Sequence, residues 1–356
     1  MMQIVKRAET SKTDNLKIRS IAILLSLLIL GLFLLIIKLN PIEVYAAIVK
    51  GSFGTSYSLR QTLIRAIPLI ITSLGIAVAF KMQFWNIGGE GQIVMGAFAA
   101  SFFALKFPDM DKLPLLLIMF CAGILGGGLW ALIAAVLKGR WKTNETIVTL
   151  MLNYIALKFI TYLQYGPWRD KNSMGFPKIP SFSLNATLPD VFDINIGWII
   201  AIILVIIVYI FMKYTKKGYE ISVLGESEKT AIYAGINIRK TMYIAIFISG
   251  ALCGIAGVIQ ASAVSRTLSV EVAGGAGFTA IIIAWLSALS APIIVIVSIL
   301  FAALLEGASY IQTALGIPQA AAQLIQAIVL FFVLGSEFFT KYKIRFKSQG
   351  MQKEAK

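Results

Sequence analysis

The chain has 356 residues, of which 58% are hydrophobic and only 14% are charged, and its formal net charge is +15. Soluble domains are about 45–50% apolar and about 25% charged, so this composition excludes a soluble enzyme and a disordered chain. Long apolar runs argue against a β-barrel, whose strands alternate over short segments. The composition therefore predicts an all-α, polytopic membrane protein.

Ten apolar runs are predicted to cross the bilayer as helices of about 17–25 residues. They lie at 19–38, 62–80, 91–107, 114–137, 144–164, 196–212, 241–264, 275–289, 291–312 and 319–340. The third and eighth runs are short and flanked by glycine, which marks them as candidates for broken or re-entrant helices. We expect a cytoplasmic segment at 1–18, a transmembrane permease domain at 19–340, and a basic cytoplasmic tail at 341–356.

The distribution of basic residues predicts the orientation of these spans. With the N-terminus inside, 21 of the 32 Lys and Arg residues fall on the inner side and 9 on the outer side. Excess Lys and Arg in cytoplasmic loops sets membrane topology, so both termini are predicted to be cytoplasmic. The positive charge is then a feature of the inner membrane surface and predicts no nucleic-acid partner.

Several kinds of chemistry are missing from the sequence. Histidine is absent, which removes His-based acid–base catalysis and most zinc sites. No G-x-x-x-x-G-K-[S/T] motif is present, so the chain has no phosphate-binding loop of its own. Cys121 and Cys253 lie in apolar runs and are interpreted as packing residues. We predict no catalytic residue, cofactor or metal.

Polar residues after the second span are the first candidates for the translocation pathway. In K-M-Q-F-W-N-I-G-G-E-G-Q, three glycines within four positions interrupt a helix, and Trp85, Asn86, Glu90 and Gln92 lie beside apolar runs. One interpretation is an unwound turn on the pathway. The other is a cytoplasmic corner between helices, held by capping hydrogen bonds.

Two later segments carry further candidates. Ser249–Gly257 contains the G-x-x-x-G pair Gly250 and Gly254, which predicts tight helix packing. In the ninth span, Glu306 is the most deeply placed carboxylate and a further pathway candidate. The alternatives are that it bonds a neighbouring helix or is protonated. Trp285 is interpreted as core packing, with ring stacking as the alternative.

Two connections are unusually long. The outer loop at 165–195 is rich in proline, and the inner loop at 213–240 is charged with a helical centre. Because loops longer than about 12–15 residues are usually functional, the inner loop is predicted to dock a cytosolic partner.

These segments together resemble the permease subunits of ATP-binding-cassette (ABC) importers, in the branched-chain amino acid, ribose and nucleoside permease family, closest to its nucleoside (simple-sugar-type) branch. The resemblance lies in L-I-R-A-I-P-L at 63–69, F-W-N-I-G-G-E-G-Q at 84–92, the inner-loop stretch 225–236 and the small-residue stretch at 249–257. Trp85 and Ser227 differ from the residues that are commoner at these positions of the family motifs.

The resemblance implies the ten-helix fold of an importer permease in the bacterial cytoplasmic membrane. It implies a second, related permease, a cytosolic ABC ATPase and an extracytoplasmic substrate-binding lipoprotein as partners, with membrane lipid around them. The ATPase-coupling residues would be Gly225, Glu226, Ser227, Ala231, Gly235 and Ile236.

The function expected from this resemblance is an ATP-driven importer subunit for nucleosides, with ATP hydrolysis on a separate subunit. One alternative is a permease for a monosaccharide or another small polar solute. Another is an ion-coupled secondary transporter, which would need intramembrane carboxylates such as Glu90 and Glu306. A third is a membrane scaffold that transports nothing.

Overall fold

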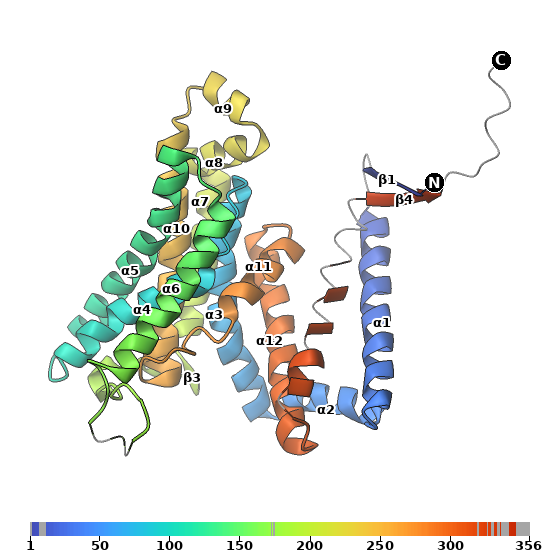
Figure 1. Cartoon of the computed structure of the whole chain (residues 1–356), viewed down its shortest axis with the longest axis horizontal. Coiled ribbons are helices and arrows are strands. Elements are labelled where there is room, and N and C mark those ends of the chain that lie inside the picture. Colours follow the sequence, from blue (N-terminus) through green and yellow to red (C-terminus); the bar gives the residue numbers. More distant parts are fainter. Residues whose placement is uncertain are drawn as a thin grey trace. The chain divides into compact units, whose positions relative to one another are not determined.

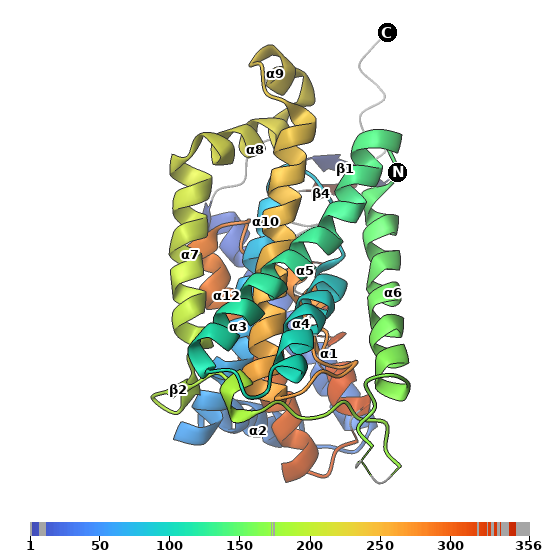
Figure 2. The ribbon, with the colours of Figure 1, turned by 90° about the vertical axis from the view of Figure 1, so that its left-hand side faces the viewer.

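The computed structural model describes residues 2–6, 12–171, 173, 175–318, 320–325, 327–328, 331–332, 335 and 342–346. These residues are largely helical, with two short antiparallel strand pairs (Figures 1 and 2). The helical class predicted from composition is therefore confirmed. The chain divides into two compact units, Met1–Ser58 with Ala303–Lys356, and Leu59–Ala302.

The first unit contains both ends of the described chain. Strand β1 (Met2–Lys6) pairs with β4 (Tyr342–Phe346), and α1 (Lys12–Ile36) leads into α2 (Pro41–Phe53), which turns by 116° from Leu24–Ile36. Its core contains Leu30, Leu34, Val44, Ile311, Ile317, Ala322 and Ile325. Helix α2 was not predicted, although Asn40 caps it by accepting the N–H of Ile42 and is followed by proline at the first helical position.

The second unit contains most of the predicted spans. Its elements are α3 (Ser56–Lys81), α4 (Gly89–Lys106), α5 (Lys112–Trp141), α6 (Glu145–Tyr165), η1 (Leu184–Ala186), β2 (Asp190–Val191), β3 (Ile194–Asn195), α7 (Gly197–Tyr214), α8 (Lys216–Glu226), α9 (Glu228–Tyr233), α10 (Ile238–Ile259), the π-helical η2 (Gln260–Ser265), α11 (Ala276–Leu286) and α12 (Ala291–Ala314). Helix α3 begins, and α12 ends, in the first unit.

Glycine contacts bring α10 against α4 and α5 at backbone distance. A methyl group added at Gly254 would lie 2.1 Å from the carbonyl oxygen of Gly123, and one at Gly257 would lie 2.1 Å from that of Ile93. A methyl group at Gly250 would lie 2.4 Å from the carbonyl oxygen of Gly127. The helix packing predicted from the G-x-x-x-G pair is confirmed, because only glycine fits at these crossings.

The described residues include six helices long and apolar enough to cross a membrane, or up to seven if α1 and α2 form one bent span. Helices α4 and α11, the short third and eighth runs, are not among them. Helix α11 has 11 residues, and at 1.5 Å per residue it covers about 17 Å, roughly half of a hydrocarbon core of about 30 Å. The ten-span count stays a prediction, since the tenth run at 319–340 and the tail at 341–356 lie partly outside the described residues.

Candidate functional site

A carboxylate at the start of α4 holds the start of α11. The Glu90 carboxylate accepts the backbone N–H of Gly275 through one oxygen and that of Gly277 through the other, each at 2.8 Å. Glu90 is only 6% exposed. Backbone N–H groups in the first turn of a helix lack intrahelical acceptors and attract negative charge, so the pairing stabilises the point where α11 begins.

Gly277 allows this close approach. A methyl group added at Gly277 would lie 2.1 Å from the backbone nitrogen of Glu90. The segment before α11 also bends sharply, with positive φ at Gly274 and Gly275. Any larger residue at position 277 would therefore push the two helix starts apart.

A second hydrogen-bond network fixes the turn that precedes α4. The Asn86 amide donates to Ser249 Oγ of α10 at 3.0 Å and to Gln92 Oε1 at 3.2 Å, and the Gln92 amide donates back to Asn86 Oδ1 at 2.9 Å. Asn153 of α6 accepts the N–H of Gly91 and donates to the carbonyl of Ile87. Asn86 and Gln92 are fully buried by the chain itself.

These partners place the turn inside the bundle. Ser249 is the twelfth residue of α10, about 17 Å along that helix at 1.5 Å per residue. In both ribbon views α4 lies in the half of its unit away from α8 and α9 (Figures 1 and 2). The capping hydrogen bonds expected for a corner between helices are present, but the turn that they hold lies among buried helices. Irregular backbone at such depth is tolerated where protein or a wet cavity surrounds it.

Trp85 lies on the exposed side of this turn. Its ring is 44% exposed and stacks on Trp285 of α11, with ring centroids 5.4 Å apart and an interplanar angle of 26°. Phe80 of α3 completes the cluster, 5.5 Å from Trp85 and 5.7 Å from Trp285. Ring stacking, the alternative for Trp285, is what the structure shows.

The inner-loop helices are joined directly to the same turn. Gln83 Nε2 donates to the carbonyl of Gly225 at 2.5 Å, and a methyl group at Gly225 would lie 1.9 Å from the carbonyl oxygen of Lys81. Gly225 is buried at the end of α8, whereas Glu226 is exposed. These contacts join the end of α8 to the end of α3 and to the 82–92 segment.

The short helix α9 presents an exposed apolar tip. Ser227 caps it by accepting the N–H of Thr230, Ala231 is buried, and Gly235 ends the segment at φ 71°. Ile236 donates its N–H to the carbonyl of Ala231. Ala231 is covered by the chain, whereas Ile232 and the neighbouring Tyr233 are 60% and 93% exposed.

A hydrogen bond to a carboxylate of α8 ties α8 to α10. Glu220 accepts from Lys217 at 2.5 Å and from Thr241 of α10 at 2.9 Å. The hydrogen bond from Lys217 holds the pKa of Glu220 below its usual value. Burial acts against this lowering, and the hydrogen bond from Thr241 adds to it.

A separate ion pair lies at the end of α5. Lys138 pairs with Glu145, and its Nζ lies 4.9 Å from the Phe84 ring centroid.

Glu306 lies elsewhere in the chain. It is half-buried on α12 in the first unit, whereas Trp85, Asn86, Glu90 and Gln92 belong to the second. Thr149 of α6 is a further partner of the turn, because its hydroxyl oxygen accepts the N–H of Ile87 at 3.2 Å. Sequence reasoning did not identify Ser249, Thr149 and Asn153 as partners of the turn. Their signal was present, because each is a polar residue inside an otherwise apolar span.

Two helices of the second unit expose contrasting faces. The outward face of α6 carries Met151, Tyr154, Ile155, Lys158, Tyr162 and Tyr165. The middle turns of α7 expose Ile202, Ile203, Ile206, Ile207 and Ile210, and Tyr209 and Tyr214 are exposed toward its end. Among the residues that the structure describes, no carboxylate pairs with Lys158.

Comparison with known proteins gives consistent results. Residues 58–334 match the family described as "Branched-chain amino acid transport system / permease component". The glucose ABC transporter permease protein TsgB13 of Haloferax volcanii is 31% identical, covering 91% of this chain and 88% of that protein. The guanosine ABC transporter permease protein NupP of Bacillus subtilis is 31% identical, with coverage of 96% and 98%. The nucleoside ABC transporter permease protein NupB of Lactococcus lactis is 32% identical, with coverage of 91% and 92%.

Proposed function

Because the chain belongs to the family of branched-chain amino acid transport system permease components, we propose that it forms part of the pore of an ATP-driven importer for nucleosides. The observation that carries the nucleoside assignment is the match to NupP along 96% of this chain and 98% of that protein. The similar match to the glucose permease TsgB13 keeps a monosaccharide as the second candidate.

The proposed orientation places α8 and α9 in the cytoplasm, with both chain termini on the same side. The excess of Lys and Arg in the segments on that side supports it. The chain then has about ten spans in the bacterial plasma membrane, with residues 1–18 and 341–356 inside and the 165–195 loop outside. In this orientation α4 and α11 both start near the middle of the membrane. The contact of Glu90 with Gly275 and Gly277 supports this placement, because it joins the two helix starts.

The proposed pathway runs past the 82–92 segment. Trp85 offers an exposed aromatic surface beside Trp285, on which a nucleobase can stack. Asn86, Glu90 and Gln92 act from the buried side by fixing the backbone of that segment and the start of α11. Glu306 remains a further pathway residue of α12.

The outward face of α6 is proposed to meet the second permease around the pathway. A lysine near the middle of a span is costly in lipid and is normally turned to water, to a partner or to a helix interface. Lys158 and the neighbouring tyrosines are therefore expected to face water or a partner protein, since the described part of the chain gives Lys158 no anionic partner.

The cytosolic ATPase is proposed to dock on the segment from Gly225 to Ile236. The exposed tip formed by Ile232 and Tyr233 provides an apolar anchor, and Glu226 lies beside it. The contacts of Gly225 with Lys81 and Gln83 then carry the motion to the pathway. An extracytoplasmic binding protein would deliver the solute from the opposite side.

Uptake of labelled guanosine, cytidine and glucose into cells with and without the gene tests this function. Loss of nucleoside uptake, with competition by unlabelled nucleosides and none by glucose, is the expected result. Loss of glucose uptake alone would establish the second candidate. Unchanged uptake of all three would overturn both.

The Glu90→Gln variant tests the proposed site within that assay. It keeps the shape of the side chain but replaces two charge-assisted hydrogen bonds, so we expect nucleoside uptake to fall about tenfold with normal membrane insertion. Glu271→Gln is the matched control, because Glu271 is an exposed carboxylate in the segment before α11. Equal uptake by both variants would remove Glu90 from the transport site.

A further inference from the structure

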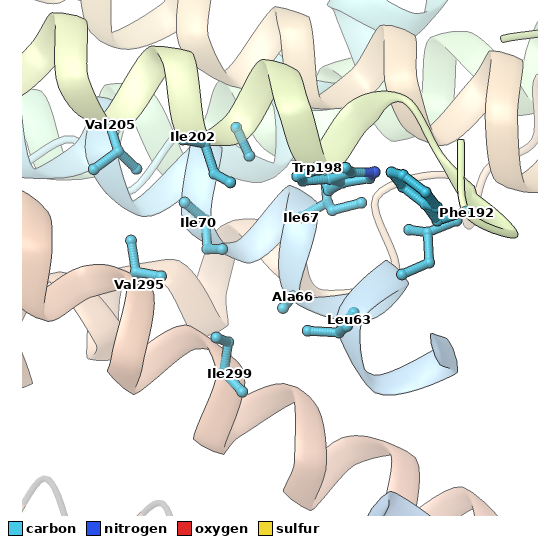
Figure 3. A pocket seen from close by; sticks show the side chains of 12 residues that line it. Leu63, Ala66, Ile67, Ile70, Phe192, Trp198, Ile202, Val205, Val295 and Ile299 are labelled. Carbon is cyan, nitrogen blue, oxygen red and sulfur yellow. The ribbon is translucent and has the colours of Figure 1, made fainter. Parts of the chain in front are cut away.

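Helices α3, α7 and α12 enclose two cavities that follow one another along the same three helices. The first has a volume of about 300 Å³ and is lined by apolar side chains, among them Leu63, Ile67 and Ile70 of α3, Val205 of α7, and Val295 and Ile299 of α12 (Figure 3). The second, of about 250 Å³, continues past Leu74 and Val78 of α3, Val208 of α7 and Ile294 of α12. Their lining residues follow one another in order along all three helices, and we call the two cavities together the groove.

The end of the groove nearest α8 is basic. Lys81, the last residue of α3, and Lys213, near the end of α7, both line the second cavity together with Ser222 of α8. Lys213 Nζ is 3.0 Å from the hydroxyl oxygen of Tyr209. Within the described residues, neither lysine pairs with a carboxylate. Two unneutralised ammonium groups at the mouth of an apolar groove favour an anion that carries a hydrocarbon chain.

The groove is bordered by a helix that faces lipid. Helix α7 exposes five isoleucines at about half of their surface and no charged residue over its middle turns. Such an apolar face is compatible with contact to the hydrocarbon core of the membrane. A membrane lipid can therefore enter beside α7 without crossing the protein.

We propose that this groove binds one anionic phospholipid of the cytoplasmic leaflet, with its phosphate at Lys81 and Lys213 and an acyl chain along the apolar wall. The proposal rests on the orientation given under Proposed function. From Lys81 to Ile70 is eleven residues of helix, about 16 Å, which matches the hydrocarbon depth of one leaflet, about 15 Å.

The site lies at the junction that couples α8 to the 82–92 segment. The carbonyl of Lys81 is the atom against which Gly225 packs, and Ser222 of α8 lines the same cavity. A bound lipid thus contacts the ends of α3 and α7 and the side of α8. Its headgroup fixes the relative position of these elements.

Lipid retention by the purified full-length chain tests the proposal without any transport assay. The chain is purified from membranes containing phosphatidylglycerol and phosphatidylcholine, and retained lipids are quantified by mass spectrometry. In titrations, Lys81→Gln combined with Lys213→Gln should weaken phosphatidylglycerol binding about twenty-fivefold, from a roughly fivefold contribution of each lysine. Lys142→Gln, at an exposed lysine at the end of α5, should bind like the unchanged chain.

A second variant tests the apolar wall. Ala77→Phe fills the second cavity and leaves both lysines in place, so it should reduce lipid retention while the elution profile stays monodisperse. Equal retention by the lysine variants and the unchanged chain would overturn the proposal. Thermal stabilisation by inorganic phosphate equal to that by phosphatidylglycerol would overturn it too, by showing a free-anion site. Failure of nucleoside uptake bears only on the proposed function.

Discussion

Helices α6 and α7 are both poorly covered by their own chain, yet they expose different chemistry. The membrane-capable window of α6 is 28% buried and that of α7 is 17% buried. The outward face of α6 carries Lys158 and three tyrosines, whereas the middle turns of α7 expose isoleucines and its two exposed tyrosines lie toward its end. Exposure alone does not identify a lipid-facing helix. The chemistry of the exposed face separates a surface for lipid from a surface for water or a partner.

The largest expected difference between the two faces is their access to water. Single cysteines at positions 158 and 206, in a chain carrying Cys121→Ala and Cys253→Ala, should react with a charged, water-soluble thiol reagent at rates differing about a hundredfold, because only the hydrated thiolate reacts. The measurement is the labelling rate in intact membranes. Both cysteines should react equally after denaturation, and fast labelling at position 206 would contradict the assignment of α7.

Adding a lysine at the same depth in each helix should impair membrane insertion through α7 more than through α6. Ile206 and Ile155 each lie near the middle of their helices, α7 and α6. Lysine at the centre of a lipid-facing helix costs about 2.5–3.5 kcal/mol on insertion, so Ile206→Lys should reduce the inserted protein at least tenfold. Ile155→Lys should insert nearly normally. Immunoblots of the membrane fraction check both, and equal losses would place α6 in lipid.

Removing the charge of α6 should affect transport and leave insertion unchanged. Lys158→Met keeps a long, unbranched side chain without the ammonium group, and we expect guanosine uptake to fall about fivefold, or about 1 kcal/mol. Lys158→Arg should retain most of the uptake. Normal uptake by the Met variant would show that Lys158 merely extends its head to the membrane surface.

The smallest expected effect concerns a hydroxyl group on the same face. Tyr154→Phe removes one polar group, and a net hydrogen-bond contribution of about 0.5–1.5 kcal/mol gives roughly a threefold loss of uptake. Ile155→Val, on the same turn, removes a methylene group and no polar atom, so uptake should stay unchanged. The same initial-rate assay compares the two, and a greater loss in the Val variant would assign the face to packing.

Composition and apolar run length predicted the fold class, because burying that much apolar surface requires lipid. The G-x-x-x-G pair at Gly250 and Gly254 predicted a close helix crossing, since small residues act locally at the contact. The glycine-rich stretch before α4 marked the broken backbone, and Glu90 was recognised as a candidate there. Local pattern was informative wherever one residue type decides the local geometry.

The partners across the fold could not be predicted in the same way. The bonds of Glu90 to Gly275 and Gly277, and of Asn86 to Ser249, join residues more than 160 positions apart. No local periodicity encodes such pairings. Helix α2 was missed for a different reason, because its apolar residues continue the first span and the Asn40–Pro41 start signal was not used.

The glycine crossings have a consequence for biosynthesis. Helices α4 and α5 leave the ribosome well before α10, with α6, α7, α8 and α9 made in between. Until α10 arrives, Gly96, Gly123 and Gly127 lack the backbone of Gly250 and Gly254 that they contact in the folded unit, and the face they form is open to lipid. Co-translational assembly of this unit therefore includes a late step in which α10 packs onto α4 and α5, and α11 and the start of α12 follow it. A chain stalled between α5 and α10 would be the form most exposed to membrane quality control.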